Sequence, residues 1–114
     1  MKKQSLLAAG IDFVDQTVKL IESLPQSGWK AVVGPQLEIC VKSMLDNMRI
    51  AMEGKSANIR KRHVSLSKEL AQECGFWLKL LGTVFPENTV VARLRMDCRE
   101  IEKCIVSWEF CKSS

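Results

Sequence analysis

The sequence has no long hydrophobic run and no strand-like alternation. Charged residues break every apolar segment within a few positions, far short of the roughly 20 apolar residues that a membrane helix needs. Residues 1–10 are basic and then apolar, but Asp12 and Asp15 follow before a signal-peptide core develops, so we expect them to begin a helix. Alternation with period two is not sustained, and β-branched residues do not cluster as they do in strands. These absences favour an all-α protein.

Paired cysteines and clustered histidines are also lacking. The five cysteines are odd in number and form no C-x-x-C pair, which favours a reducing cytoplasm over a secreted disulfide framework. His63 is the only histidine, so one chain cannot build a His-based zinc site or a Ser-His-Asp triad. Zinc at Cys98, Cys104 and Cys111 is a weaker interpretation than ordinary buried thiols. We therefore expect a protein that is not an enzyme and holds no cofactor.

A phosphate-binding loop is incomplete. Residues 54–56, Gly-Lys-Ser, resemble the end of a P-loop, but Arg49 occupies the position of its first glycine. The segment also follows a predicted helix, whereas a P-loop follows a strand. A helix end and a turn are the better interpretation.

Four segments with helical periodicity are separated by breaks at residues 25–35, around Gly54 and at 82–88. With 114 residues, 46% of them hydrophobic, the chain is expected to form one domain over residues 1–114. The apolar rows are Leu7, Ile11, Val14, Val18 and Ile21; Leu37, Val41, Met44, Met48 and Ala51; Ile59, Leu66, Leu70, Cys74, Trp77 and Leu81; and Val91, Leu94, Cys98, Ile101, Ile105 and Trp108. Short connections between helices of similar length predict an antiparallel up-down-up-down four-helix bundle.

The helix ends carry chemical signals. Pro35 suits the first turn of the second helix, where its missing N–H costs nothing. Gly54 suits the end of that helix, where a positive φ is common. Ser56 or Asn58 is predicted to cap the third helix, and Thr89 the fourth.

Basic side chains gather in two groups. The first is Lys55, Arg60, Lys61, Arg62 and Lys68, and the second is Arg93, Arg95, Arg99 and Lys103. Cations in the first turn of a helix oppose the helix macrodipole, and such a local conflict points to a function. Both groups are candidates for contact with nucleic-acid phosphates, and a solvated exterior is the alternative. His63 is placed on the same solvated basic face. Aromatic residues do not lie among the basic ones, so base-specific binding of single strands is not indicated.

Residues 76–81, Phe-Trp-Leu-Lys-Leu-Leu, are apolar at five of six positions. Such a run surrounds the helix instead of following one row, and a helix that is apolar all round is usually buried on more than one side. Phe76, Trp77 and Leu80, together with Trp108, therefore predict self-association through the third and fourth helices. A thick core is the alternative.

Several of these segments together resemble a known family. They are Glu53-Gly54-Lys55-Ser56, Arg60-Lys61, residues 76–81 and Ser107-Trp108, within the last two thirds of the chain. The pattern resembles the accessory variability determinant (Avd) proteins of diversity-generating retroelements. These belong to a wider group of four-helix-bundle proteins encoded in intervening sequences of 23S ribosomal RNA genes. Residues 49–54 read Arg-Ile-Ala-Met-Glu-Gly where the intervening-sequence branch has Asn-Ile-Ala-Glu-Gly, which favours the Avd branch.

The resemblance implies a non-enzymatic, basic homopentameric barrel. Such a protein binds the retroelement's reverse transcriptase and nucleic acid, and it is needed for mutagenic copying of template RNA. By residue match, Lys55, Arg60 and Lys61 would contact the partner or the nucleic acid, and Trp77 would serve in packing. An intervening-sequence-type oligomer with a structural or unknown role is the alternative, and a small bundle enzyme is the weakest interpretation because no catalytic pair is present.

Overall fold

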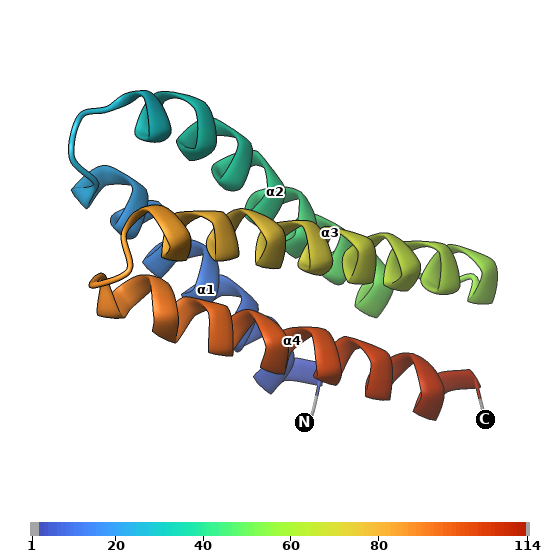
Figure 1. The fold of residues 1–114 in the computed structure, drawn as a ribbon. Helices are drawn as coiled ribbons and strands as arrows, with labels where there is room; N and C mark the ends of the chain where they lie inside the picture. Colours follow the sequence, from blue (N-terminus) through green and yellow to red (C-terminus); the bar gives the residue numbers. More distant parts are fainter. Residues whose placement is uncertain (1–2, 114) are drawn as a thin grey trace.

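The computed structural model describes residues 3–113, with side chains over residues 5–107. Four helices make up this part of the chain: α1 Lys3–Ser23, α2 Gly28–Glu53, α3 Ala57–Val84 and α4 Thr89–Ser113 (Figure 1). They lie lengthwise in an elongated bundle of 45 × 20 × 19 Å. Within the described range, no helix is long and apolar enough to cross a membrane. The predicted all-α four-helix bundle is confirmed.

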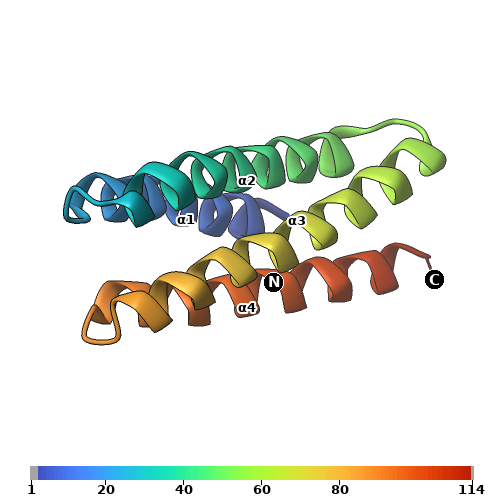
Figure 2. The same ribbon diagram turned by 45° about the horizontal axis from the view of Figure 1, so that its top comes forward.

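Contacts between the helices show that each neighbouring pair is antiparallel. On α2 and α3, the Asn47 side chain contacts His63 while Cys40 contacts Cys74, so the residue numbers rise on one helix as they fall on the other. Gln72 bonds Glu102 between α3 and α4. Contacts of α1 with α2 and with α4 follow the same rule and close the bundle, as Figures 1 and 2 show.

The start of α2 differs from the prediction. Ser27 caps it, because its Oγ accepts a hydrogen bond from the Lys30 N–H at 3.2 Å. The Lys30 ammonium in turn donates to the Glu22 and Leu24 carbonyls, each at 3.1 Å, and so satisfies the end of α1. Pro35 therefore lies inside the helix, not in its first turn. Its exposed position leaves room for the ring, and the helix loses the hydrogen bond that an N–H there would donate.

The turn between α2 and α3 needs glycine for a reason other than the predicted one. Gly54 ends α2 with φ of −61°, so the expected positive φ is wrong. A Cβ at this position would lie 2.9 Å from the Ile50 carbonyl oxygen, a distance too short for any side chain.

The N-terminal caps of the last two helices were predicted in part. Ser56, one of the two residues predicted for this position, caps α3. Asn88, and not Thr89, caps α4, because its Oδ1 accepts from the N–H groups of the two residues after Thr89.

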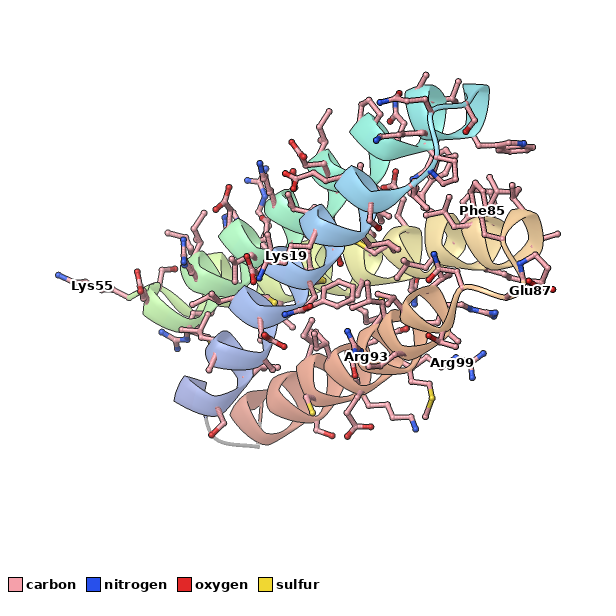
Figure 3. The ribbon with its side chains drawn as sticks, turned by 90° about the vertical axis from the view of Figure 1, so that its left-hand side faces the viewer. Lys19, Lys55, Phe85, Glu87, Arg93 and Arg99 are labelled. Atoms are coloured by element: carbon pink, nitrogen blue, oxygen red, sulfur yellow. The ribbon has the colours of Figure 1, made fainter. Side chains whose placement is uncertain are left out.

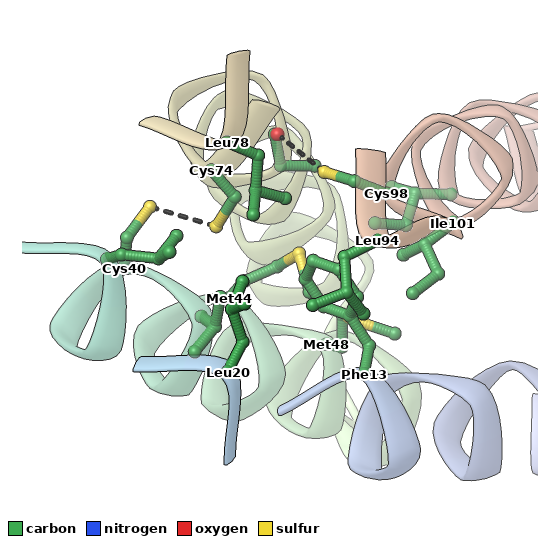
Figure 4. Packing of buried hydrophobic residues seen from close by; sticks show 14 of the residues in the cluster. Phe13, Leu20, Cys40, Met44, Met48, Cys74, Leu78, Leu94, Cys98 and Ile101 are labelled. Atoms are coloured by element: carbon green, nitrogen blue, oxygen red, sulfur yellow. Dashed lines mark hydrogen bonds between the residues drawn. The ribbon is translucent and has the colours of Figure 1, made fainter. Parts of the chain in front are cut away.

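The buried side chains of all four helices form one cluster, part of which Figure 4 shows. The predicted rows of α2 and α4 are buried throughout the residues whose side chains are described. The row of α1 is wrong: Ile11 is 48% exposed, and Phe13 is buried in its place. On α3, Ile59 is exposed although the prediction placed it in the core. Both helices carry apolar residues on more than one row, so periodicity alone left their rotation undetermined.

Candidate nucleic-acid interface

The fold keeps the two basic groups apart. The first group begins at the α2–α3 turn, whereas Arg95 and Arg99 lie beside the part of α3 between Gln72 and Lys79. Ten residues of α3 separate Arg62 from Gln72, which is about 15 Å along the helix axis. Figure 3 shows Lys55 at one end of the molecule, far from Arg99. The two groups therefore form two surfaces instead of one.

In the first group, Arg60 has a structural role in the α2–α3 turn. Its Nη1 donates to the carbonyls of Gly54 at 3.0 Å and Lys55 at 3.1 Å, so the guanidinium holds the turn before α3. This contact also explains how a cation is accommodated in the first turn of a helix. Lys55, Lys61 and Arg62 are exposed, and Lys68 is half-buried. Three cations of the first group are therefore exposed.

His63 does not lie on a solvated basic face, which corrects the prediction. Its Nδ1 is 2.7 Å from Oδ1 of Asn47, and the Asn47 amide donates to the Ser43 carbonyl at 2.8 Å. Because Asn47 Oδ1 is an acceptor, the imidazole Nδ1–H donates to it. His63 thus links α3 to α2. Its partner is 16 residues away on another helix, so no local pattern indicates the bond.

Two cations of the second group, Arg95 and Arg99, converge with Lys79, which neither predicted group contains, on a groove between α3 and α4. We call it the α3–α4 groove; it has a volume of about 270 Å³ and is lined by Gln72, Gly75, Phe76, Lys79, Arg95, Cys98, Arg99 and Glu102. The half-buried Arg95 side chain extends across to Gly82 on α3. Its Nη1 lies 3.5 Å from the position that a Cβ on Gly82 would occupy. At the other end, Gln72 Nε2 donates to Glu102 Oε1 at 3.1 Å.

The α3–α4 groove has an excess of positive charge. Within the part of the chain whose side chains are described, ion pairs join Lys19 to Asp15 and Lys42 to Glu38, both outside the groove. Three cations line the groove against one carboxylate, which is already hydrogen-bonded to Gln72. Positive charge in a concave site concentrates anions there. The groove can therefore hold phosphate groups.

Arg93 and Lys103 lie outside the α3–α4 groove. Arg93 precedes Arg95 by two positions, which places the two side chains on nearly opposite sides of α4. The neighbouring α1–α4 groove is acidic, with Asp12, Asp97 and Glu100 among its lining residues. Lys103 is exposed one turn beyond Arg99 and extends the positive row along α4.

The residues proposed for self-association occupy different environments. Trp77 and Leu80 are half-buried and pack against the core cluster. Phe76 is 59% exposed and meets the Trp77 ring edge-on, with 5.2 Å between the ring centroids. The side chain of Trp108 lies outside the described residues. Of the three described side chains, Phe76 is the most exposed to a partner molecule.

Sequence reasoning missed an apolar surface on α2. Trp29 is 45% exposed, and Val32 and Ile39 are each 63% exposed. Their spacing of three and seven residues places them on one side of the helix, and Val32 and Ile39 lie roughly opposite the buried row that includes Leu37. We call these three residues the α2 apolar surface. The signal was present, because α2 has two apolar rows and only one of them can face the core.

Three cysteines are packed in the core, and their thiols take part in hydrogen bonds. Cys74 Sγ donates to Cys40 Sγ at 3.0 Å, and Cys98 Sγ donates to the Ala71 carbonyl at 3.2 Å (Figure 4). The hydrogen bond to Cys40, together with burial, raises the pKa of Cys74 far above its ordinary value. Burial raises the pKa of Cys98 to about 12.

Metal binding by these thiols has no support in the described residues. Among them, no group of three His, Cys, Asp or Glu side chains could hold a metal ion. The side chain of Cys111, part of the weaker zinc interpretation, lies outside the described residues.

Comparison with known proteins identifies a similar fold. The chain is similar to a solved structure from Bacteroides thetaiotaomicron, a protein with unknown function from the S23 ribosomal protein family. The TM-score is 0.86 and the identity 22%, over 96% of this chain and 98% of the other. No family model matches the sequence, and no curated protein matches it. The likeness shows the four-helix fold.

Proposed function

We propose that this protein is a non-enzymatic, oligomeric accessory protein that binds nucleic acid, as the resemblance to Avd proteins implies. The observation that carries the proposal is the convergence of Lys79, Arg95 and Arg99 on one groove without a paired carboxylate. Exposed cations at the α2–α3 end, Lys55 and Lys61 among them, add a second positive surface. A fold shared with a protein of the S23 ribosomal protein family supports membership of the wider intervening-sequence group.

The energetic basis is the release of counterions. Each phosphate that a lysine or arginine neutralises frees condensed cations, so affinity depends on salt and little on sequence. Repeating the groove around an oligomer would turn a weak single contact into avid binding of a long strand. In the retroelement, this strand would be the template RNA or its cDNA, and the second partner would be the reverse transcriptase.

An intervening-sequence-type oligomer with a structural role is the second candidate. The lower similarity of residues 49–54 to that branch is the sequence argument against it. The two candidates differ in one observable feature of the genome. A reverse transcriptase gene beside this one supports the Avd-like function, and its absence supports the alternative.

Replacing Arg95 and Arg99 with glutamine is expected to weaken nucleic-acid binding about ten-fold near physiological salt, for all sequences alike. The slope of log affinity against log salt concentration should fall by about 1.4, because two phosphate contacts to a single strand are lost. Fluorescence anisotropy with labelled RNA at several salt concentrations measures both quantities.

The matched control is the double variant Lys19→Gln with Lys42→Gln. It removes the same charge from α1 and α2, at positions paired with Asp15 and Glu38. Its binding should stay close to that of the parent protein. Equal weakening by the two double variants would mean that overall charge drives binding and that the groove has no special part in it.

The α2 apolar surface is the site that we propose for contact with a second copy of this chain. Exposed apolar side chains that share one side of a helix are typical of protein interfaces.

Replacing both Val32 and Ile39 with glutamate should reduce the mass of the assembly in solution to that of one chain, 12.9 kDa, because the charges would be buried against an apolar partner. Light scattering measures the mass, and Met96→Glu, an exposed change on α4, is the control. The expectation that the oligomer has five copies of the chain rests on the resemblance alone. An unchanged mass for the double variant would exclude this surface as the contact.

A further inference from the structure

The α3–α4 groove contains an aromatic ring as well as cations. The groove residues fall into three levels: Lys79 with Arg95 at one end, Phe76 with Arg99 in the middle, and Gln72 with Glu102 at the other end. This order follows from the antiparallel pairing of α3 and α4. The sequence places Phe76 nineteen positions before Arg95, so only folding brings the ring among the basic side chains.

Phe76 is placed to receive another planar group. More than half of its surface is exposed, although the side chain lines a concave site. The planes of Phe76 and Trp77 meet at 69°, so the neighbouring indole does not stack on the phenyl ring. An exposed ring beside cations is the combination by which proteins bind single strands, where bases stack and phosphates pair with basic side chains.

We propose that the α3–α4 groove binds single-stranded nucleic acid, with one base stacked on Phe76 and the adjacent phosphates held by Lys79, Arg95 and Arg99. This inference rests on the proposed function and adds the form of nucleic acid that the site takes. A duplex keeps its bases inside the helical stack, so it could offer the groove only its phosphates. Arg95 and Arg99 are about 6 Å apart along α4, which suits contact with successive phosphates of an extended strand.

The other end of the groove is suited to base edges. The Gln72 amide and the Glu102 carboxylate lie there, already bonded to each other at 3.1 Å. They offer donors and acceptors, and the carboxylate keeps phosphates toward the Lys79 end. Neither stacking nor phosphate pairing senses the ribose 2′-hydroxyl, so RNA and single-stranded DNA should bind with similar affinity.

Phe76→Leu is the variant that separates stacking from charge. It should weaken binding of a short oligouridylate about ten-fold, because leucine keeps an apolar side chain but removes the π-face. It should leave binding of an abasic strand of the same length, and of a duplex of the same length, unchanged. Phe76→Trp should retain the affinity for oligouridylate. Fluorescence anisotropy gives the affinities, with Met96→Ala as a control for loss of an exposed apolar side chain.

Each other outcome overturns the proposal in a distinguishable way. Equal weakening on the abasic strand and the duplex would mean that Phe76 only shapes the groove. A fall in oligomer mass in Phe76→Leu would mean that the ring contacts a second copy of the chain. If Phe76→Leu binds like the parent while Arg95→Gln with Arg99→Gln binds weakly, the stacking site is absent and the proposed function survives. If the parent binds no nucleic acid, both proposals fail.

Discussion

Raising the pH from 9 to 11 is expected to lower the free energy of unfolding by on the order of 5 kcal/mol, because two core thiols stay protonated in the folded protein. The pKa of Cys98 is raised to about 12 from an ordinary 9.0, and that of Cys74 is raised further. Below pH 9, both the folded and the unfolded chain keep these protons, so their effect on stability is constant. Above pH 9, the unfolded chain releases two protons that the folded chain retains. Stability therefore falls by about 3 kcal/mol per pH unit.

Urea unfolding at several pH values under reducing conditions measures this loss. The chain has no tyrosine, so no phenol group titrates in the same range. The control is the double variant Cys74→Ala with Cys98→Ala, which is less stable at neutral pH but should lose the steep alkaline dependence. The same slope in this variant would assign the effect to other groups, such as lysines.

Phe13→Ala is expected to destabilise the protein by about 3–5 kcal/mol, the cost of removing a buried aromatic ring and leaving a cavity. Phe13 is 2% exposed and lies near Met48 and Leu94 in the core (Figure 4). An effect of this size approaches the total stability of many small domains. Thermal and urea unfolding followed by circular dichroism would measure it.

The neighbouring variant Ile11→Ala serves as the matched control. Ile11 is about half exposed on the same helix, so its loss should cost no more than about 0.5 kcal/mol. The pair also tests the rotation of α1, because the sequence pattern predicted Ile11 in the core. A larger cost for Ile11→Ala than for Phe13→Ala would mean that the opposite row faces the core.

The sequence by itself determined the features that depend on neighbours along the chain. It predicted the four helices, their order, the buried row of α2 such as Leu37 and Met44, and Ser56 as one of two candidate caps of α3. These predictions were confirmed because helical periodicity and capping act over a few residues. The start of α2 and the cap of α4 were predicted wrongly, because Ser27 takes the position expected near Pro35 and Asn88 takes the one expected of Thr89. Of the three cations that line the α3–α4 groove, Arg95 and Arg99 were identified, since charge is a property of the residue and not of the fold, whereas Lys79 was missed.

The tertiary structure decided which residues meet across helices. It selected Phe13 over Ile11 for the core and buried Thr17, whose hydroxyl has no hydrogen-bond partner. It also placed Phe76 beside the cations of α4, a combination that cannot be seen when the two helices are read separately in the sequence. The physical reason is that packing depends on how each helix is rotated and how far it slides against its neighbours. Helices with more than one apolar row permit several rotations, and the choice among them is made by the fit of the whole core.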